Sequence, residues 1–275
     1  RDTHFVYRMI IVYLIITASS AIALRLTKMP WFDAVTLAMS ACSTCGFCTK
    51  TLSVAFYDSW GVEAILCVAM LLGATNFSLL FSTIWPNKHD HKNVFNSQVF
   101  RWFLSLVAIA ILAVTANLYF SGYCPSFPKA FRLAAFQVCS LSTTTGFATT
   151  DTNLWPSGSI GILILCSLIC GCSGSTSGGI KMDRLVIALK SIPGMIKTLI
   201  GFCNVNNIKV EEETKTEEKV TSVLTYIAFY VCIIAVGTIF FAISMDFKTS
   251  LSASIACMGS VGPGFGEVSL DRKSV

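Results

Sequence analysis

Long runs of apolar residues without a single charged side chain dominate the sequence. Four of these runs exceed the roughly 20 residues that a helix needs to cross the hydrocarbon core of a bilayer. They cover residues 64–86, 102–128, 152–180 and 220–245. A shorter run, residues 9–24, is a fifth candidate. This pattern predicts an all-α polytopic membrane protein.

A second pattern is an internal repeat. Residues 43–47 (STCGF) and 143–147 (TTTGF) share the order Thr-x-Gly-Phe and lie at an offset of 100 residues. A third, weaker copy places Gly262 at the position of Gly146. All three copies occupy the same place relative to a long apolar run, which indicates a repeated structural unit.

Each copy has the same order of elements. A long apolar helix is predicted first, at residues 9–24, 102–120 and 220–245. A segment of about a dozen semi-apolar residues follows, at residues 31–42, 130–141 and 247–258, and each segment is followed by a Gly-containing turn. Because a 12-residue helix rises only about 18 Å, these segments are expected to be re-entrant half-helices rather than membrane spans. A second long helix is expected at residues 60–84 and 159–189, whereas the third copy stops at Val275 before any second helix.

The repeats divide the chain into four parts. They are residues 1–95, residues 96–203, a charged linker at residues 204–219, and residues 220–275. The linker contains the run EEETKTEEK, which is typical of a solvated segment without its own fold. Lys and Arg are more frequent on the linker side of the predicted spans, so we expect the linker in the cytoplasm and the re-entrant loops outside.

Composition supports the membrane assignment and excludes other classes. Hydrophobic residues make up 54% of the chain and charged residues 13%, with a mean hydropathy of +0.69, whereas soluble domains carry about 25% charge. A soluble enzyme, a disordered tail and a secreted disulfide scaffold are therefore excluded. The net charge of +5 is not arranged in a basic stripe with interleaved aromatic residues, so no nucleic acid is expected as a partner.

The Gly-containing turns are expected to line a pore. Non-helical backbone at membrane depth is tolerated only beside protein or a water-filled cavity, and Gly reaches backbone conformations that turn carbonyl groups toward a passing ion. Rings of carbonyl oxygens that replace a hydration shell are how potassium filters work. The C-terminal end of each half-helix adds roughly half a negative charge near the membrane centre.

The Gly- and Ser-rich stretch at residues 171–181 is expected to be a gate. It lacks the adjacent Gly-Lys-[Ser/Thr] of a phosphate-binding loop, because Ile180 separates Gly179 from Lys181, and an apolar helical run precedes it instead of a strand. A break of this kind within a spanning helix leaves backbone groups unpaired, and a Lys in a cation path repels the ion unless it moves aside. The alternative is that Lys181 simply begins the cytoplasmic end, together with Arg184 and Lys190.

Other polar residues have simpler interpretations, with one exception. Cys42, Cys45 and Cys48 have a spacing that suggests a metal or iron–sulfur site, although no fourth ligand is evident. Asp58 and Glu63 are expected to cap the start of the helix that follows them. An Asn within a spanning run, residue 76, is expected to bond a neighbouring helix.

Three motifs together resemble the Trk/Ktr/HKT potassium-transporter superfamily, and most closely its bacterial Trk-type membrane subunits. They are residues 140–151 (SLSTTTGFATTD), residues 171–181 with Arg184, and residues 261–266 (VGPGFG). The resemblance covers the whole chain. It implies helix–pore-loop–helix units around a pseudo-fourfold pore, of which this chain would hold the second, third and a truncated fourth. A further half-helix and loop are then expected before Arg1.

The resemblance also implies which residues act. The filter would consist of Thr44, Cys45, Gly46, Phe47, Thr144, Thr145, Gly146, Phe147, Ser260, Val261, Gly262 and Pro263. The gate would consist of Gly171, Gly174, Ser175, Gly178, Gly179 and Lys181. It further implies a homodimer in the cell membrane and a cytoplasmic ring of nucleotide-binding regulatory subunits as partner. Two departures stand out: the first filter segment is absent, and the three Cys residues are unusual in a filter.

The sequence therefore predicts potassium uptake through a carbonyl-lined filter, and no enzyme activity. Potassium would be the substrate, and no covalent cofactor is expected. Because the missing first segment helps to decide ion selectivity, a sodium-selective or Na/K-coupled relative stays open. A membrane metal or redox protein that uses the Cys42 cluster is the alternative from another class.

Overall fold

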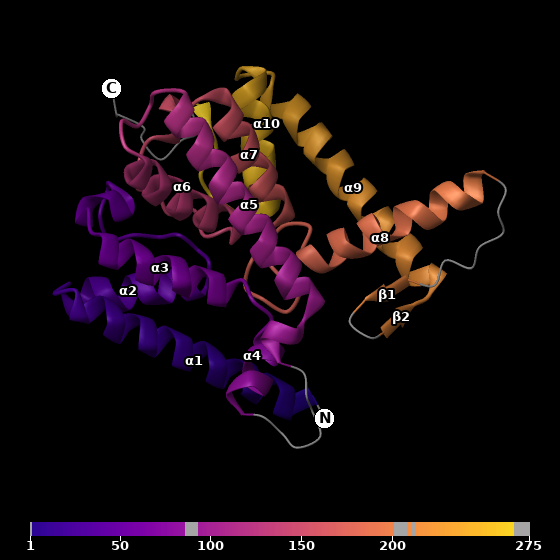
Figure 1. Cartoon of the computed structure of the whole chain (residues 1–275), viewed down its shortest axis with the longest axis horizontal. Helices are drawn as coiled ribbons and strands as arrows, with labels where there is room; N and C mark the ends of the chain where they lie inside the picture. The colour runs from indigo at the N-terminus through magenta and orange to yellow at the C-terminus, as the bar shows by residue number, and fades with distance from the viewer. Residues whose placement is uncertain (1, 86–92, 201–207, 211–212, 267–275) are drawn as a thin grey trace.

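The structure, a computed structural model, describes residues 2–85, 93–200, 208–210 and 213–266 (Figure 1). Its α-helices are α1 (Asp2–Leu26), α2 (Trp31–Cys42), α3 (Trp60–Gly73), α4 (Phe77–Ile84), α5 (Gln98–Phe120), α6 (Phe127–Ser142), α7 (Ser157–Ile169), α8 (Met182–Leu199), α9 (Glu217–Phe241) and α10 (Phe247–Gly259). Short 3-10 helices lie at Ser53–Tyr57, Val94–Asn96 and Thr152–Leu154, and two strands are β1 (Ile208–Val210) and β2 (Glu213–Lys215).

The expected alternation of long and short helices is present. Among the described residues, α1, α5 and α9 are each long and apolar enough to cross a membrane. Each is followed by a short helix that packs back against it: α2 on α1, α6 on α5 and α10 on α9. In Figure 1 the unit α1–α4 and the pair α9–α10 flank the central unit of α5–α7 on opposite sides.

The second helix of the first unit is not continuous, contrary to the expectation for residues 60–84. It breaks into α3 and α4, which are bent by 104° relative to each other. Asn76 does not bond a neighbouring helix as expected; its side-chain oxygen caps α4 by accepting the N–H groups of Ser78 (2.9 Å) and Leu79 (3.3 Å). The carbonyl of Gly73 accepts the N–H of Thr176, 3.2 Å away. The break persists because a distant segment takes over the freed backbone groups.

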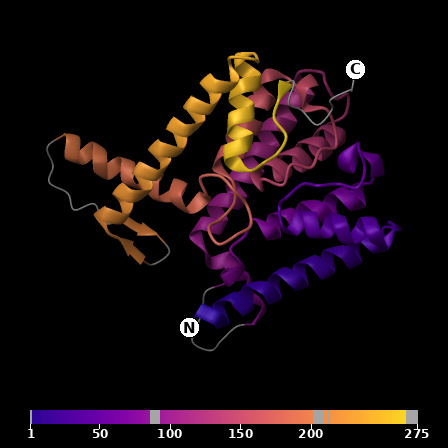
Figure 2. The ribbon, with the colours of Figure 1, turned by 180° about the vertical axis from the view of Figure 1, so that it is seen from behind.

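The second helix of the central unit is interrupted at residues 170–181, between α7 and α8. Cys170 ends α7 with a φ of +59°, and Lys181 precedes α8 with a φ of +73°. Figure 2 shows this loop near the middle of the molecule. The Gly- and Ser-rich sequence cannot continue the helix at low energy, because Gly and Ser disfavour helix interiors.

Apolar side chains cover the outside as well as the inside of the helical bundle. Large hydrophobic residues such as Leu14, Ile109, Leu112, Ile239 and Phe240 are exposed on α1, α5 and α9. Buried polar residues, in contrast, gather at the ends of the half-helices, where Ser140, Ser142, Thr143, Thr144 and Thr145 are all at most 1% exposed. This distribution suits hydrocarbon on the outside and a polar interior.

The linker between the second and third units contains a short β-hairpin, which the charged sequence did not predict. β1 and β2 pair antiparallel with Ile208 opposite Lys215 and Val210 opposite Glu213. The helix α9 begins at Glu217, inside the predicted linker. His89 and His91, in the polar stretch that precedes α5, lie outside the described residues.

The cap at Asn76 can be tested by its effect on stability. We expect Asn76→Ala to lower the free energy of unfolding by about 1 kcal/mol, because two N–H groups of α4 lose their acceptor. Asn76→Ser should lose less, since Ser is also a good cap. Thermal melting of the detergent-solubilised protein measures the difference, and equal melting temperatures for the two variants would contradict the capping role.

Candidate functional site

The half-helices α2, α6 and α10 end in the same backbone motif. The residue after the last turn is left-handed in each, with φ of 51°, 59° and 55° at Thr44, Thr144 and Ser260. Its N–H donates to the carbonyl three residues back, and the next N–H donates to the carbonyl five residues back. The bonds that span five residues run from the N–H of Cys45 to Ser40 (3.0 Å), of Thr145 to Ser140 (2.9 Å) and of Val261 to Ala256 (3.0 Å). Each is a Schellman motif, whose left-handed position usually holds Gly.

The left-handed conformation recurs two residues later. Gly46, Gly146 and Gly262 have φ of 75°, 82° and 94°. A left-handed non-Gly residue costs about 1–2 kcal/mol, and such strain gathers at functional sites. The alternation of left-handed and ordinary residues also turns successive peptide planes, so that neighbouring carbonyls can face the same side of the segment. Three segments with one unusual backbone are therefore candidates for one shared role.

The three segments converge in the structure. A Cβ atom added to Gly46 would overlap the carbonyl oxygen of Thr145, and one added to Gly146 would overlap that of Val261. Segment 44–47 thus packs against segment 144–147, which packs against segment 260–263. A Cβ atom at Gly262 would meet nothing within 4 Å. The contacts require Gly at the first two positions, because no larger residue leaves room for the neighbouring backbone.

Burial differs among the three segments. The four residues of the middle segment, Thr144–Phe147, are buried. In the first segment, Thr44 is buried, but Cys45 is exposed and Phe47 is 81% exposed. In the third segment, Val261 is buried, Pro263 is half-buried, and Ser260 and Gly262 are exposed. The middle segment is enclosed because it has a neighbour on each side.

Side chains of the half-helices hold the backbone that follows each turn. The Ser140 hydroxyl donates to the carbonyl of Phe147 at 2.7 Å. The Ser252 hydroxyl on α10 both donates to the carbonyl of Phe265 and accepts its N–H, each at 3.0 Å. Since each Ser is on the half-helix and its partner lies beyond the turn, these bonds fix the returning chain against the helix.

In α2, an acidic residue near the start of the half-helix also holds the returning chain, whereas the acidic residue before α10 caps that helix. Asp33 accepts the Thr49 hydroxyl at 2.7 Å and lies 3.5 Å from the Lys50 ammonium. Its pKa is below the ordinary value, chiefly because of the bond from Thr49. Asp246 caps α10 by accepting the N–H and hydroxyl of Thr249, and these bonds lower its pKa as well. A carboxylate at a helix N-terminus also interacts favourably with the helix dipole.

The loop at residues 170–181, which we call the intramembrane loop, touches the C-terminal ends of all three half-helices. The N–H of Gly178 donates to the Thr144 hydroxyl at 2.9 Å, and the Thr176 hydroxyl donates to the carbonyl of Cys42 at 3.0 Å. A Cβ atom at Gly178 would overlap the carbonyl oxygen of Gly259 at the end of α10. The loop therefore lies directly at the base of the three converging segments.

The intramembrane loop also binds the break between α3 and α4. The N–H of Cys172 donates to the carbonyl of Ala74 at 2.9 Å, and the N–H of Phe77 donates to the carbonyl of Gly174 at 3.2 Å. A Cβ atom at Gly171 would lie 2.7 Å from the Ala74 oxygen. Two interrupted helices thus satisfy each other's backbone, as required where no water or lipid can do so.

Lys181 folds back over the intramembrane loop. It is half-buried, and its ammonium donates to the carbonyl of Ser175 at 3.3 Å and approaches the Ser175 hydroxyl at 3.5 Å. Gly179, two residues before Lys181, has a φ of 71° and packs on Cys170 so closely that no Cβ fits. The ammonium group of Lys181 is therefore bound to the loop itself.

The other two basic residues of this region make contacts further along α8. Arg184 donates to the carbonyl of Ile180 at 3.1 Å and stacks on the Tyr226 ring of α9, 4.1 Å from its centroid. Lys190 donates to the side-chain oxygen of Gln98 on α5 at 2.8 Å. These cations join α8 to neighbouring helices, whereas Lys181 contacts the loop.

The sequence interpretation of Asp58 and Glu63 as helix caps is wrong. Both bind Arg132 of α6, which donates to Glu63 at 2.7 and 2.8 Å and to Asp58 at 2.7 Å. Arg132 also lies 5.6 Å from the centre of the Trp60 ring. This cluster joins the first unit to the half-helix of the second. The available signal was that Arg132 is the only charged residue in the predicted half-helix at residues 130–141, but the sequence does not identify its partner.

Cys42, Cys45 and Cys48, in and around the first segment, do not form a metal site. Cys42 is buried, Cys48 is half-buried, and the exposed Cys45 donates to the Ser40 hydroxyl at 3.4 Å. Across the part of the chain that the structure describes, no group of three His, Cys, Asp or Glu residues is placed to hold a metal ion. The geometry gives the metal or redox alternative no support.

The Arg132 cluster leads to a stability prediction. Arg132→Gln should lower the free energy of unfolding by about 3 kcal/mol, because it leaves the carboxylate of Glu63 buried without a partner. Adding Glu63→Gln should restore part of the loss, and Lys129→Gln, an exposed neighbour, should change little. Chemical or thermal unfolding in detergent measures these effects; a double variant no more stable than Arg132→Gln alone would contradict the pairing.

Comparisons with known proteins agree with this geometry. The family model TrkH, described as cation transport protein, matches residues 3–274. The Trk system potassium uptake protein TrkH of Vibrio parahaemolyticus is 31% identical over 265 residues, which cover 94% of this chain and 54% of that protein. TrkG of Escherichia coli, also a Trk system potassium uptake protein, is 30% identical over 261 residues, covering 93% and 52%.

A comparison with solved structures also matches a TrkH protein. The crystal structure of the potassium transporter TrkH from Vibrio parahaemolyticus superposes with a TM-score of 0.90 at 30% identity, over 98% of this chain and 57% of that one. The chain spans about half the length of the curated relatives it matches. It is a helical integral membrane protein, and it belongs to the TrkH family of cation transport proteins.

Proposed function

We propose that this chain contributes to potassium uptake across the cell membrane. Segments 44–47, 144–147 and 260–263 would form the selectivity filter, and the intramembrane loop would form its gate. The observation that carries the proposal is the direct packing of Gly46 and Gly146 on the carbonyl of the next segment. The printed names of the relatives, which are potassium uptake proteins, supply the identity of the ion.

The mechanism follows from the backbone of the three segments. A cation that enters the filter loses water, and main-chain carbonyl oxygens take the place of that water. The partial negative charges at the C-terminal ends of α2, α6 and α10 add to the attraction at the base of the filter. No side-chain charge is needed for binding, so the ion can also leave on the far side.

The intramembrane loop would close the path below the filter. It contacts the ends of all three half-helices and holds the cation of Lys181, which repels a potassium ion. The hydrogen bonds that join it to the ends of α2 and α6 are between neutral groups and are worth about 1 kcal/mol each in net terms. The loop can therefore leave its position without disrupting the helices, and this movement would open the path.

The division of the chain is part of the proposal. Residues 1–95 and 96–203 would be the second and third repeats, residues 204–219 a cytoplasmic linker, and residues 220–275 part of the fourth. The common order of long helix, half-helix and turn supports this division. Gly46 and Gly146 each pack on the next segment, so Gly262 would pack in the same way on a further equivalent segment of the full-length protein.

The proposed partners rest on the family resemblance alone. We propose that the full-length protein forms a homodimer and binds a cytoplasmic ring of nucleotide-binding regulatory subunits. Potassium is the transported substrate, and no covalent cofactor is part of the proposal. The discrimination against sodium depends on the complete filter, so it is a property of the full-length protein.

Replacement of Gly146 tests the filter. We expect Gly146→Ser to reduce potassium/sodium discrimination strongly, because its side chain would collide with the Val261 carbonyl. Gly122→Ser is a matched control, since Gly122 has a similar φ of 73° but nothing within 4 Å of its Cβ position. Flux assays with both ions in proteoliposomes make the measurement, and unchanged discrimination in Gly146→Ser would refute the filter assignment.

Replacement of Lys181 tests the gate. Lys181→Ala, and separately the deletion of residues 173–177, should raise potassium flux at a fixed driving force, because a repulsive charge or the loop itself is removed. Lys197→Ala is the control, since Lys197 is an exposed cation on the same helix α8. The gate proposal should be abandoned if both Lys181→Ala and the deletion show wild-type flux.

A further inference from the structure

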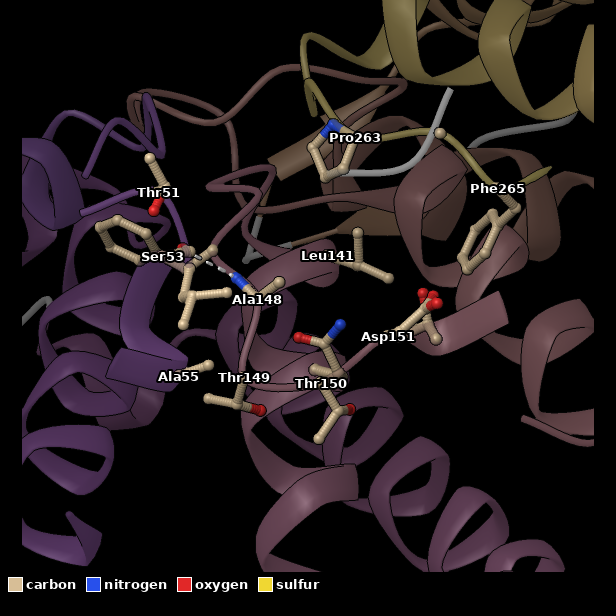
Figure 3. A pocket seen from close by; sticks show the side chains of 15 residues that line it. Thr51, Ser53, Ala55, Leu141, Ala148, Thr149, Thr150, Asp151, Pro263 and Phe265 are labelled. Atoms are coloured by element: carbon tan, nitrogen blue, oxygen red, sulfur yellow. Dashed lines mark hydrogen bonds between the residues drawn. The ribbon is translucent and has the colours of Figure 1, made fainter. Parts of the chain in front are cut away.

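A chamber of about 210 Å³ lies between α6 and the chain that follows the turns. We call it the side chamber. Figure 3 shows side chains from three regions around it: Ser53 and Ala55 from the first unit, Thr149, Thr150 and Asp151 from the second, and Pro263 and Phe265 from the third. Phe147 also lines the chamber. Since Phe147 belongs to the middle segment and is 1% exposed, the side chamber lies beside the proposed filter.

The side chamber contains polar groups that have no partner. The side-chain oxygen of Gln137 and the hydroxyls of Thr149 and Thr150 are buried without a hydrogen bond, and all three residues line the chamber. Gln137 is 4% exposed, in the middle of α6. Buried polar groups in proteins are nearly always satisfied, by protein atoms or by a bound species. These three groups therefore point to an occupant.

The charge of the lining indicates a cation. Asp151 is the one charged residue among the described residues that line the chamber, and its Oδ1 accepts the N–H of Asn153 at 2.9 Å. The unpartnered amide oxygen of Gln137 is an acceptor only. Carboxylate, amide and hydroxyl oxygens are ligands of hard cations. An anion would find no positive side chain here.

The size and the single carboxylate indicate a monovalent ion with water. A water molecule occupies about 30 Å³ in the liquid, so the side chamber has room for an ion that keeps several waters. One carboxylate balances one positive charge, whereas Ca²⁺ sites with useful affinity recruit several carboxylates. Another hydroxyl of the wall, that of Ser53, already accepts the N–H of Ala148.

We propose that the side chamber binds one partly hydrated potassium ion beside the filter. The ion would be held by Gln137, Thr149, Thr150 and Asp151, and it would tie α6 to the chain that follows the middle segment. This inference rests on the proposed function, because it takes the ion from the adjacent path. It adds a binding site that lies outside the row of filter carbonyls.

The test uses Tl⁺, a potassium substitute with strong anomalous scattering. Crystals of the full chain soaked in Tl⁺ should show a peak in the side chamber in addition to peaks along the filter. Gln137→Leu and Asp151→Asn should each lose the chamber peak and keep those in the filter. Asp246→Asn, the same change at an acid that caps α10 away from the chamber, should keep both.

Gln137→Glu provides a test in the opposite direction. The second carboxylate should lower the Tl⁺ concentration for half-occupancy of the chamber several-fold, which a purely structural Gln would not do. The inference is overturned by a chamber without anomalous signal when the filter is filled, or by a chamber peak that survives both Gln137→Leu and Asp151→Asn. Absence of peaks in filter and chamber alike would contradict the proposed function as well.

Discussion

Close backbone contact between neighbouring turns is the constraint on which the rest of this structure depends. Gly46 and Gly146 touch the carbonyl of the next segment so closely that no side chain fits. Such contact brings peptide groups from three distant parts of the chain to one place. Carbonyl groups in an apolar surrounding need partners, and in the proposed function a passing cation is that partner. The half-helices and their caps hold this arrangement, together with Ser140 and Ser252, which bond the chain beyond the turns.

The intramembrane loop depends on the same constraint. A chain that leaves helical geometry at membrane depth must find hydrogen-bond partners, and the loop finds them at the ends of the half-helices and at the break between α3 and α4. Each interruption makes the other tolerable. The gate that we propose would exchange partners without exposing apolar surface to water, because the helices on either side stay packed.

The sequence predicted much of this in outline. A 12-residue apolar segment cannot span, and an apolar run with a Gly-rich centre cannot stay helical, so half-helices and one interruption follow from local rules. The break at Asn76 was not predicted, although Gly73, Thr75 and Asn76 are poor helix formers, because the uncharged run around them is long enough to span a membrane. The Arg132 cluster was missed for a similar reason: Glu63 lies 69 residues away along the chain, and a carboxylate near a helix start fits a cap equally well.

By itself, the sequence determined the class of protein, the repeated unit and the places where Gly must supply unusual backbone. These properties depend on side-chain hydrophobicity and on local conformational freedom, both of which are set by short stretches of chain. Only the tertiary structure decided which segments meet, which partner each freed peptide group takes, and that a polar chamber lies beside the middle segment. Those outcomes depend on contacts between residues far apart in the chain, and no local pattern encodes the identity of a distant partner.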